Sequence, residues 1–178
     1  MYPVIRMLKE FWVNRRAPTL NIGDFHVSHH LCWPWDLDLW LELNNGRALT
    51  LYDLGRLVLF KRTGLLNLLK EKGWSMPVAG ASVRYRRRVH VFESFEMRSR
   101  GLFWDERFFY IEQSIWKKNG ECAGHIIYRC AFVDKAGIIN PEKVIEALGV
   151  GIEQPSIPDW IAKWIEAENN RPWPPNKE

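Results

Sequence analysis

The residues best suited to chemistry lie close together, directly before a long apolar segment. Asp36, Asp38 and Glu42 supply three carboxylates. Asn44 and Asn45 follow, at the start of the apolar segment. If that segment is a helix, its first turn has unpartnered backbone N–H groups and the positive end of the helix dipole, which could stabilise an oxyanion beside a nucleophilic or basic carboxylate. These are the parts of an acyl-transfer or hydrolysis site; the alternative is that the acids only cap the helix.

The segment that must position these residues runs from Asn45 to Lys72 and contains no proline. Apolar residues occupy most sides of a helix drawn through it, and a helix that is apolar on most sides is buried on most sides. Asn44 or Asn45 suits the N-cap, Gly64 is expected to divide the helix into a long and a short piece, and Gly73 to end it. Another part of the chain must therefore surround this helix.

Much of the remaining chain alternates between apolar and polar residues, which is typical of half-buried strands. The strand-like segments are 25–33, 77–91, a run that includes Phe95 and Met97, 109–115 and 122–133. Asn119-Gly120 predicts a tight hairpin, because both residues tolerate positive φ. A short helix is expected at 141–148, with Pro in its first turn. This order indicates an α+β fold in which a curved antiparallel sheet wraps around a long central helix.

The two ends of the chain differ from this central part. Residues 2–14 place apolar side chains at helical spacing, with Lys9, Arg15 and Arg16 outside. Residues 158–178 hold one Trp-rich helical piece that could pack on a partner subunit or lie against a membrane surface. We expect three regions in the 178 residues: an N-terminal helical extension (1–23), one domain (24–149) and a C-terminal Trp- and Pro-rich extension (150–178).

Composition argues against several classes of protein. No apolar run approaches the ~18–20 residues that cross a bilayer, and the N-terminus lacks the apolar block of a secretory signal. Three cysteines without CxxC spacing fit a reducing cytoplasm better than a disulfide framework or a zinc site. The net charge of +4 suits a polyanionic partner, but no nucleic-acid-binding motif accompanies it, so we expect no nucleic acid. We also expect no metal, because His26, His29 and His30 cannot converge from one strand.

The acidic segment resembles the D-x-D-x-x-x-H-x-N-N-[AG] signature of hotdog-fold acyl-CoA thioesterases of the 4-hydroxybenzoyl-CoA thioesterase type. It reads Asp36-Leu37-Asp38, then five residues, then Asn44-Asn45-Gly46. It is most similar to the thioesterase-superfamily-member group, in which the signature continues R-Y-L where this chain has Arg47-Ala48-Leu49. As an order of elements, the resemblance extends from about Phe25 to Leu148.

The resemblance implies a hotdog fold whose protomers pair, as homodimers or homotetramers, with sites at the subunit interface. It implies hydrolysis of an acyl thioester carried by coenzyme A or an acyl carrier protein, with no cofactor beyond the coenzyme A of the substrate. Asp38 matches the catalytic carboxylate of the signature. Asn45, with Asn44 beside it, falls where a backbone N–H points at the thioester carbonyl.

The predicted substrate contacts are Asp36, Gly46, Arg84, Arg86 and Trp40. The two arginines belong to a basic run that could pair the phosphates of coenzyme A, since guanidinium groups bind phosphate bidentately. The alternative is a solvated strand edge. Trp40 could wall an acyl pocket, or it could simply pack in the core or at a subunit interface.

One position departs from the signature, because Glu42 stands where the family has histidine. Glu42 could be a second catalytic carboxylate, and two carboxylates in a partly dry site would raise the pKa of one of them. The departure also motivates an alternative function, a hotdog protein that binds acyl chains or coenzyme A without turnover. A hotdog dehydratase is a third option, but the catalytic His and H-F-P-like loop that it needs are missing.

Overall fold

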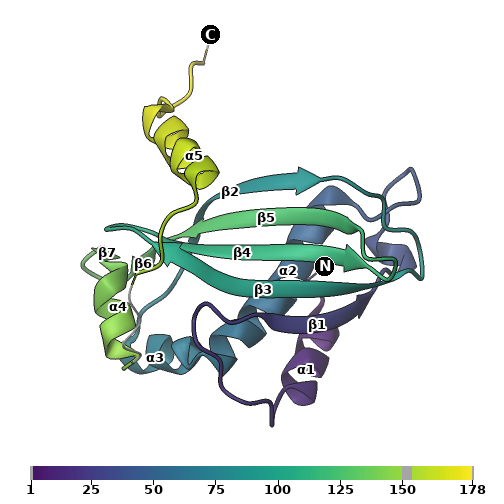
Figure 1. Ribbon diagram of the computed structural model, residues 1–178, viewed down its shortest axis with the longest axis horizontal. Helices are drawn as coiled ribbons and strands as arrows, with labels where there is room; N and C mark the ends of the chain where they lie inside the picture. Colours follow the sequence, from purple (N-terminus) through teal and green to yellow (C-terminus); the bar gives the residue numbers. More distant parts are fainter. Residues whose placement is uncertain (1, 150–153, 178) are drawn as a thin grey trace.

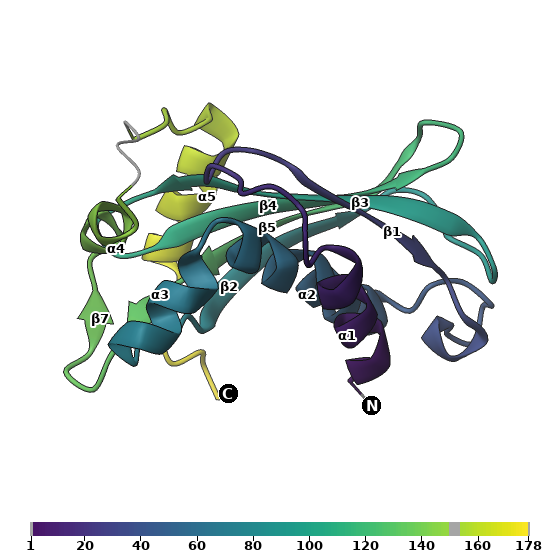
Figure 2. The ribbon, with the colours of Figure 1, turned by 90° about the horizontal axis from the view of Figure 1, so that it is seen from below.

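The structure is a computed structural model that describes residues 2–149 and 154–177. An antiparallel sheet curves around one long helix (Figures 1 and 2). In spatial order its strands are β1 (His26–Leu31), β3 (Ser94–Trp104), β4 (Phe109–Lys117), β5 (Cys122–Cys130) and β2 (Val78–Tyr85). A second, two-stranded sheet pairs β6 (Phe132–Val133) with β7 (Ile138–Ile139). The helices are α1 (Val4–Val13), the 3₁₀ turn η1 (Pro34–Asp36), α2 (Asn45–Arg62), α3 (Leu65–Lys72), α4 (Pro141–Ala147) and α5 (Asp159–Asn170).

The predicted central helix is confirmed, including its interruption. Gly64 has φ 81°, in the left-handed region where glycine has no steric cost, and separates α2 from α3; Gly73, with φ 66°, ends α3 in the same way. Only Asn45, Gly46 and Leu49 of α2 are exposed. The curved sheet, together with α1 and α3, therefore covers most of this helix, as its apolar composition requires (Figure 2).

Helix α2 approaches the sheet most closely at Gly55. A Cβ at this position would lie 2.6 Å from Ser99 Oγ and 2.8 Å from Met97 Sδ on β3. Beside this contact, the buried Gln113 of β4 donates to Ser99 Oγ and to the carbonyl of Tyr52 on α2. The missing side chain of Gly55 and the two hydrogen bonds donated by Gln113 Nε2 thus set the distance between helix and sheet.

The strand predicted over 77–91 ends earlier, at Tyr85. Tyr85 pairs with Gly124 of β5, and the residues after Tyr85 do not continue the ladder toward Cys122. The backbone N–H groups of Arg86 and Arg87 both donate to the carbonyl of Ala123, and the chain then leaves the sheet. Residues 86–89 therefore form a connection at the end of the sheet.

The predicted N-terminal helix is present, but its apolar side faces outward. Ile5 is 85% exposed and Trp12 64% exposed, whereas Glu10 is only 3% exposed. Arg6 also turns inward and pairs with Asp36 at 2.6 Å. The helix is thus fixed to the domain largely through its charged side.

The C-terminal helix α5 packs on the outer face of the sheet, the face away from α2 (Figures 1 and 2). Its buried Ile161 lies in a small apolar cluster with Phe103, Tyr110 and Ile127. The division into three regions stays a prediction, and its boundary after residue 149 adjoins residues outside those described. No helix in the described part of the chain is long and apolar enough to cross a membrane.

Two buried histidines on β1 give the fold an expected sensitivity to acid. Burial lowers the pKa of His26 to about 4 and of His30 to about 3, and the charges of Arg62 and Arg6 respectively add to the effect. In the unfolded chain both would titrate near ~6.5, so below that pH the unfolded state binds more protons than the folded state. We expect this contribution to stability to be complete above pH ~6.5 and to fall by about 3 kcal/mol for each histidine, or about 6 kcal/mol in all, by pH ~4.

Urea unfolding from neutral pH to pH ~4 measures this loss. His30 accepts or donates one hydrogen bond, with Ser28 Oγ at 2.8 Å, and lies 4.0 Å from a Glu10 carboxylate oxygen. Glutamine can keep the first contact without titrating, so His30→Gln should flatten the acid side of the stability curve. An identical slope in wild type and variant would show that His30 does not carry the acid sensitivity.

Candidate active site

The loop between β1 and α2 is closed by its own backbone. Asp38 N–H donates to the carbonyl of Glu42 at 2.9 Å, and Leu41 N–H donates back to the carbonyl of Asp38 at 3.1 Å. The Asp38 carboxylate accepts from the backbone N–H groups of Trp40, at 2.9 Å, and Glu42, at 3.5 Å. Asp38 therefore holds the turn that presents Glu42 to the rest of the site.

Asp36 lies completely buried beneath this loop. One carboxylate oxygen accepts from Arg6 Nη1 at 2.6 Å and from the backbone N–H of Trp33 at 3.1 Å. The other accepts from Arg47 Nε at 2.7 Å. The carbonyl of Asp36 also accepts the N–H of Asn44. Both oxygens thus face protein partners, and this carboxylate joins α1, the loop and the first turn of α2.

The first turn of α2 offers free backbone donors. Of the two predicted candidates, Asn44 caps the helix: its side-chain oxygen accepts from Arg47 N–H at 2.9 Å and its carbonyl from Ala48 N–H. Among the described residues, no acceptor contacts the backbone N–H of Asn45 or Gly46. These two donors, with the positive end of the helix dipole behind them, can bind an oxyanion.

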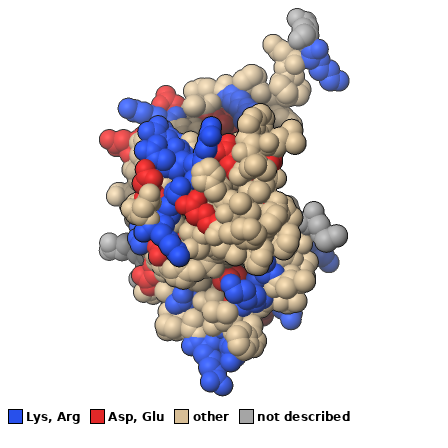
Figure 3. All heavy atoms as spheres, turned by 90° about the vertical axis from the view of Figure 1, so that its right-hand side faces the viewer, with Lys and Arg blue, Asp and Glu red and all other residues tan. Residues whose placement is uncertain are grey.

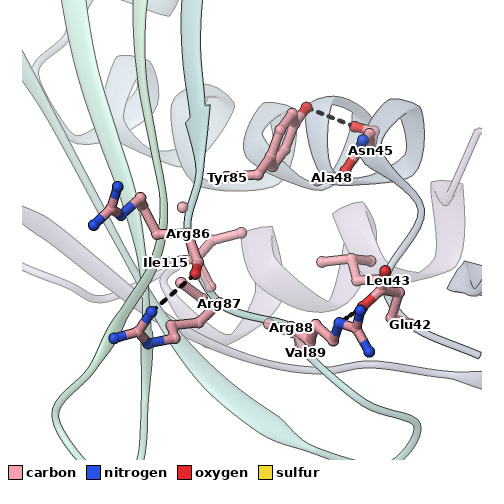
Figure 4. Close-up of a pocket in the computed structure, with 12 residues that line it drawn as sticks. Glu42, Leu43, Asn45, Ala48, Tyr85, Arg86, Arg87, Arg88, Val89 and Ile115 are labelled. Atoms are coloured by element: carbon pink, nitrogen blue, oxygen red, sulfur yellow. Dashed lines mark hydrogen bonds and ion pairs between the residues drawn. The ribbon is translucent and has the colours of Figure 1, made fainter.

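A pocket of about 230 Å³ opens beside this helix end (Figure 4). It is bounded by the end of the loop, the first turn of α2, the connection after β2, and β4 and β5. Its lining residues are Glu42, Leu43, Asn45, Ala48, Tyr85, Arg86, Arg87, Arg88, Val89, Ile115, Ala123 and Gly124. The pocket therefore joins one carboxylate, the helix terminus, a group of arginines and an apolar floor.

Ion pairs and one hydrogen bond order the pocket wall. Arg88 Nε lies 2.9 Å from a Glu42 carboxylate oxygen, and the Arg88 side chain is 73% exposed. Arg87 pairs with Glu121 at 2.8 Å. The Tyr85 hydroxyl donates to the Asn45 carbonyl at 3.0 Å, and burial raises the pKa of this phenol. Figure 4 shows Tyr85 reaching from the end of β2 to α2 while the Glu42–Arg88 pair lies at the other end of the pocket.

The surface around the pocket is basic with interspersed acids. The face turned to the viewer in Figure 3 carries a dense group of Lys and Arg side chains among several carboxylates. Arg84 and Arg86 border a second hollow next to the pocket, together with Arg87 and His125. Such a rim suits a phosphorylated ligand, because guanidinium groups pair phosphate oxygens.

The predicted site residues divide into groups. Glu42, Asn45 and Arg86 line the pocket, and Arg84 lies beside it. Asn44 and Gly46 border a different hollow, on the other side of the helix end. Asp38, Asp36 and Trp40 line none of these hollows, and Trp40 is 77% exposed. Their predicted roles in catalysis and substrate binding stay predictions.

Sequence reasoning missed Tyr85 and Gly124 as parts of the site. Tyr85 belongs to a strand, and its contact with α2 spans 40 residues. Gly124 gives the floor its depth, since a Cβ there would lie 3.1 Å from the hydroxyl of the buried Tyr52. No local pattern in the sequence signals either contact.

The curved sheet, the central helix and the site at its N-terminus together define a hotdog-fold protein. The family model of the thioesterase-like superfamily matches residues 32–165. The chain therefore belongs to this superfamily. The match does not distinguish the 4-hydroxybenzoyl-CoA type, which stays a prediction.

Similar proteins agree with this assignment. Protein THEM6 of Xenopus laevis is 32% identical over 144 residues, which are 79% of this chain and 67% of the relative. Protein THEM6 of Danio rerio is 28% identical over 170 residues, 92% of this chain and 82% of the relative. Among solved structures, the probable thioesterase YbaW from Escherichia coli has a TM-score of 0.65 at 16% identity, over 68% of this chain and 95% of that one. The DHNA-CoA thioesterase from Staphylococcus aureus has a TM-score of 0.60 at 16% identity, over 82% and 93%. These likenesses establish the shared fold.

Proposed function

We propose that the protein hydrolyses acyl thioesters of coenzyme A to the free acid and coenzyme A. The observation that carries this proposal is the pocket in which the Glu42 carboxylate and the N-terminus of α2 bound the same space. Hydrolysis of a thioester needs a base for water and donors for the developing oxyanion. The described pocket supplies both from two adjacent elements.

In the proposed reaction the thioester carbonyl oxygen accepts from the free N–H group of Asn45, which lines the pocket, with the positive end of the helix dipole behind it. Glu42 removes a proton from a water molecule as the water oxygen bonds to the carbonyl carbon. The tetrahedral intermediate then collapses with cleavage of the C–S bond. The thiolate leaves and takes up a proton, and the acid product keeps the second oxygen. A thiolate is a good leaving group, so the site needs no strong general acid.

The chain's own residues also suggest how the substrate lies. Arg86 and Arg87 are suited to the phosphates of coenzyme A, while Val89, Ile115 and Ala123 receive the first part of the acyl chain. No cofactor is needed beyond the coenzyme A of the substrate; an acyl carrier protein would present the same thioester. We propose that the site is completed in a homodimer or homotetramer, because β2 beside the pocket is a sheet edge with mostly exposed side chains. Three free cysteines favour a reducing compartment such as the cytoplasm.

A second function is favoured by the contact between Glu42 and Arg88. This ion pair occupies the carboxylate that would act as the base, so the pocket could bind an acyl group or coenzyme A without turning it over. Free coenzyme A release from a panel of acyl-CoAs, measured beside calorimetric binding of coenzyme A, separates the two functions. We expect turnover to rise above the uncatalysed rate for at least one acyl group. Binding with no turnover for any member would assign the second function.

A further inference from the structure

Helix α1 presents an apolar stripe to solvent. Ile5, Leu8 and Trp12 lie at helical spacing on one side, and they are 85%, 59% and 64% exposed. Val4 and Val13 next to them are exposed as well. In a surface helix of a water-soluble domain the apolar stripe usually faces the core. In α1 the apolar stripe faces solvent instead.

The contacts on the inward side of α1 explain why the helix is not rotated about its axis to bury the apolar stripe. Arg6 donates to the buried Asp36 carboxylate at 2.6 Å and to the carbonyl of Leu31 at 3.1 Å. Glu10 is buried beside His30, with a carboxylate oxygen 4.0 Å from the imidazole. Rolling the apolar stripe inward would leave Asp36 without one of its two arginines, which is costly for a buried carboxylate. The polar contacts therefore fix Ile5, Leu8 and Trp12 outward.

The charges around the stripe have one sign. Lys9, Arg15 and Arg16 are exposed, and Glu10 is the single acidic residue between positions 2 and 16. The Arg15 guanidinium lies over the Trp12 ring, 4.3 Å from its centroid. An exposed apolar stripe with tryptophan and flanking cations is the composition of a helix that lies in a lipid interface.

The apolar surface continues past the start of α1 into the loop after β1. Tyr2 and Trp35 border the same hollow, and the stacked rings of Trp33 and Trp35 have centroids 5.1 Å apart. Further along this loop Leu39 is 93% exposed. Figure 2 shows α1 and the blue loop that contains η1 on the same side of the sheet. The loop therefore adds exposed apolar side chains on the side of the sheet where α1 lies.

We propose that α1 binds the protein to an anionic lipid surface. Its apolar stripe enters the boundary between headgroups and acyl chains, and Lys9, Arg15 and Arg16 pair with lipid phosphates or carboxylates. A second copy of the chain is a poorer occupant, because two α1 faces carry the same positive charge and expose no acid to pair with it. This surface contact is peripheral.

Flotation with vesicles tests the proposal on the full chain. We expect binding to vesicles of phosphatidylcholine with phosphatidylserine, and much weaker binding to phosphatidylcholine alone. The apolar variant Ile5→Gln/Leu8→Gln/Trp12→Gln should bind at least about tenfold more weakly. The charge variant Lys9→Gln/Arg15→Gln/Arg16→Gln should lose a similar factor and most of its preference for phosphatidylserine.

A matched control changes exposed apolar residues elsewhere. Ile138, Ile157 and Trp173 are exposed and lie outside α1, so their replacement by Gln should leave vesicle binding unchanged. Failure of the wild type to float with anionic vesicles would overturn the proposal, as would equal binding by the apolar variant. Equal affinity for neutral and anionic vesicles would contradict the proposed preference for anionic lipid. A change in oligomer mass in the apolar variant, with vesicle binding intact, would assign the stripe to a protein contact instead.

Discussion

Replacing Glu42 by Gln is expected to lower kcat for the best acyl-CoA substrate about a thousandfold, with little change in KM. A positioned general base contributes roughly 10²–10⁴-fold, and glutamine keeps the shape of glutamate but cannot take a proton from water. The change also frees Arg88, whose side chain is 73% exposed and so stays solvated without its partner. Steady-state release of free coenzyme A measures both constants.

Asp38 provides the sharpest comparison with Glu42. Its carboxylate accepts hydrogen bonds from Trp40 and Glu42 N–H, and the amide oxygen of asparagine can accept the same bonds. If Asp38 only holds the loop, Asp38→Asn should keep kcat within about tenfold of wild type, whereas Asp38→Ala should lose more. Loss of turnover in Asp38→Asn together with an active Glu42→Gln would return the catalytic role to Asp38, as the sequence signature implies.

Glu121→Gln is the matched control, because this carboxylate pairs with Arg87 of the pocket wall but lies on the hairpin beyond it. We expect its kcat to equal that of the wild type. If Glu42→Gln also kept full activity, the loop carboxylates would have no part in hydrolysis, and the proposed mechanism would be wrong.

The sequence predicted those features of the fold that depend on neighbouring residues. The cap at Asn44 (one of the two candidates), the break at Gly64 and the hairpin at Asn119-Gly120 each follow from the preference of one or two residues, although only Gly120 of the hairpin has positive φ. The covered central helix was predictable as well, because a helix that is apolar on most sides is buried on most sides. The fold class was therefore available from local chemistry, and so was the helix end beside which the candidate pocket lies.

The composition of the site depended on contacts that local patterns do not record. Glu42 meets Arg88, 46 positions later in the sequence, only because the ladder between β2 and β5 ends at Tyr85 and releases the next residues toward α2. A strand predicted to continue through residue 91 would have sent Arg88 elsewhere. The hotdog signature drew attention to the loop that holds all three acids. Only the tertiary structure shows that Glu42 lines the pocket while Asp36 and Asp38 do not.

The orientation of α1 shows the same limit. Periodicity identifies a helix with an apolar side, but it does not state which side faces the domain. Asp36 determines which side of α1 faces the domain, because a buried carboxylate needs a cation and α1 supplies Arg6. A long-range charge requirement therefore overrides the usual burial of the apolar side.

The second large effect is expected from Asp36→Asn, which should lower the free energy of unfolding by about 3–5 kcal/mol. Asparagine has the size of aspartate, but it leaves the charge of Arg6 partly buried without its counter-ion and removes the ion pair between Asp36 and Arg47. Urea unfolding at neutral pH measures the loss. Glu96→Gln is the matched control: its partner Arg98 is 47% exposed, and exposed ion pairs contribute only about 0–1 kcal/mol.

The same variant decides between the two roles of Asp36. A substrate-binding carboxylate, as the signature implies, would raise KM on removal and leave stability nearly unchanged. If Asp36 instead joins α1 to α2, its replacement should lower the free energy of unfolding while the folded fraction keeps its KM. The replacement should also release α1, so that trypsin cleaves after Arg15 or Arg16 faster than in the wild type. Because both oxygens of Asp36 contact arginines of the protein and the side chain is completely buried, we expect the second result.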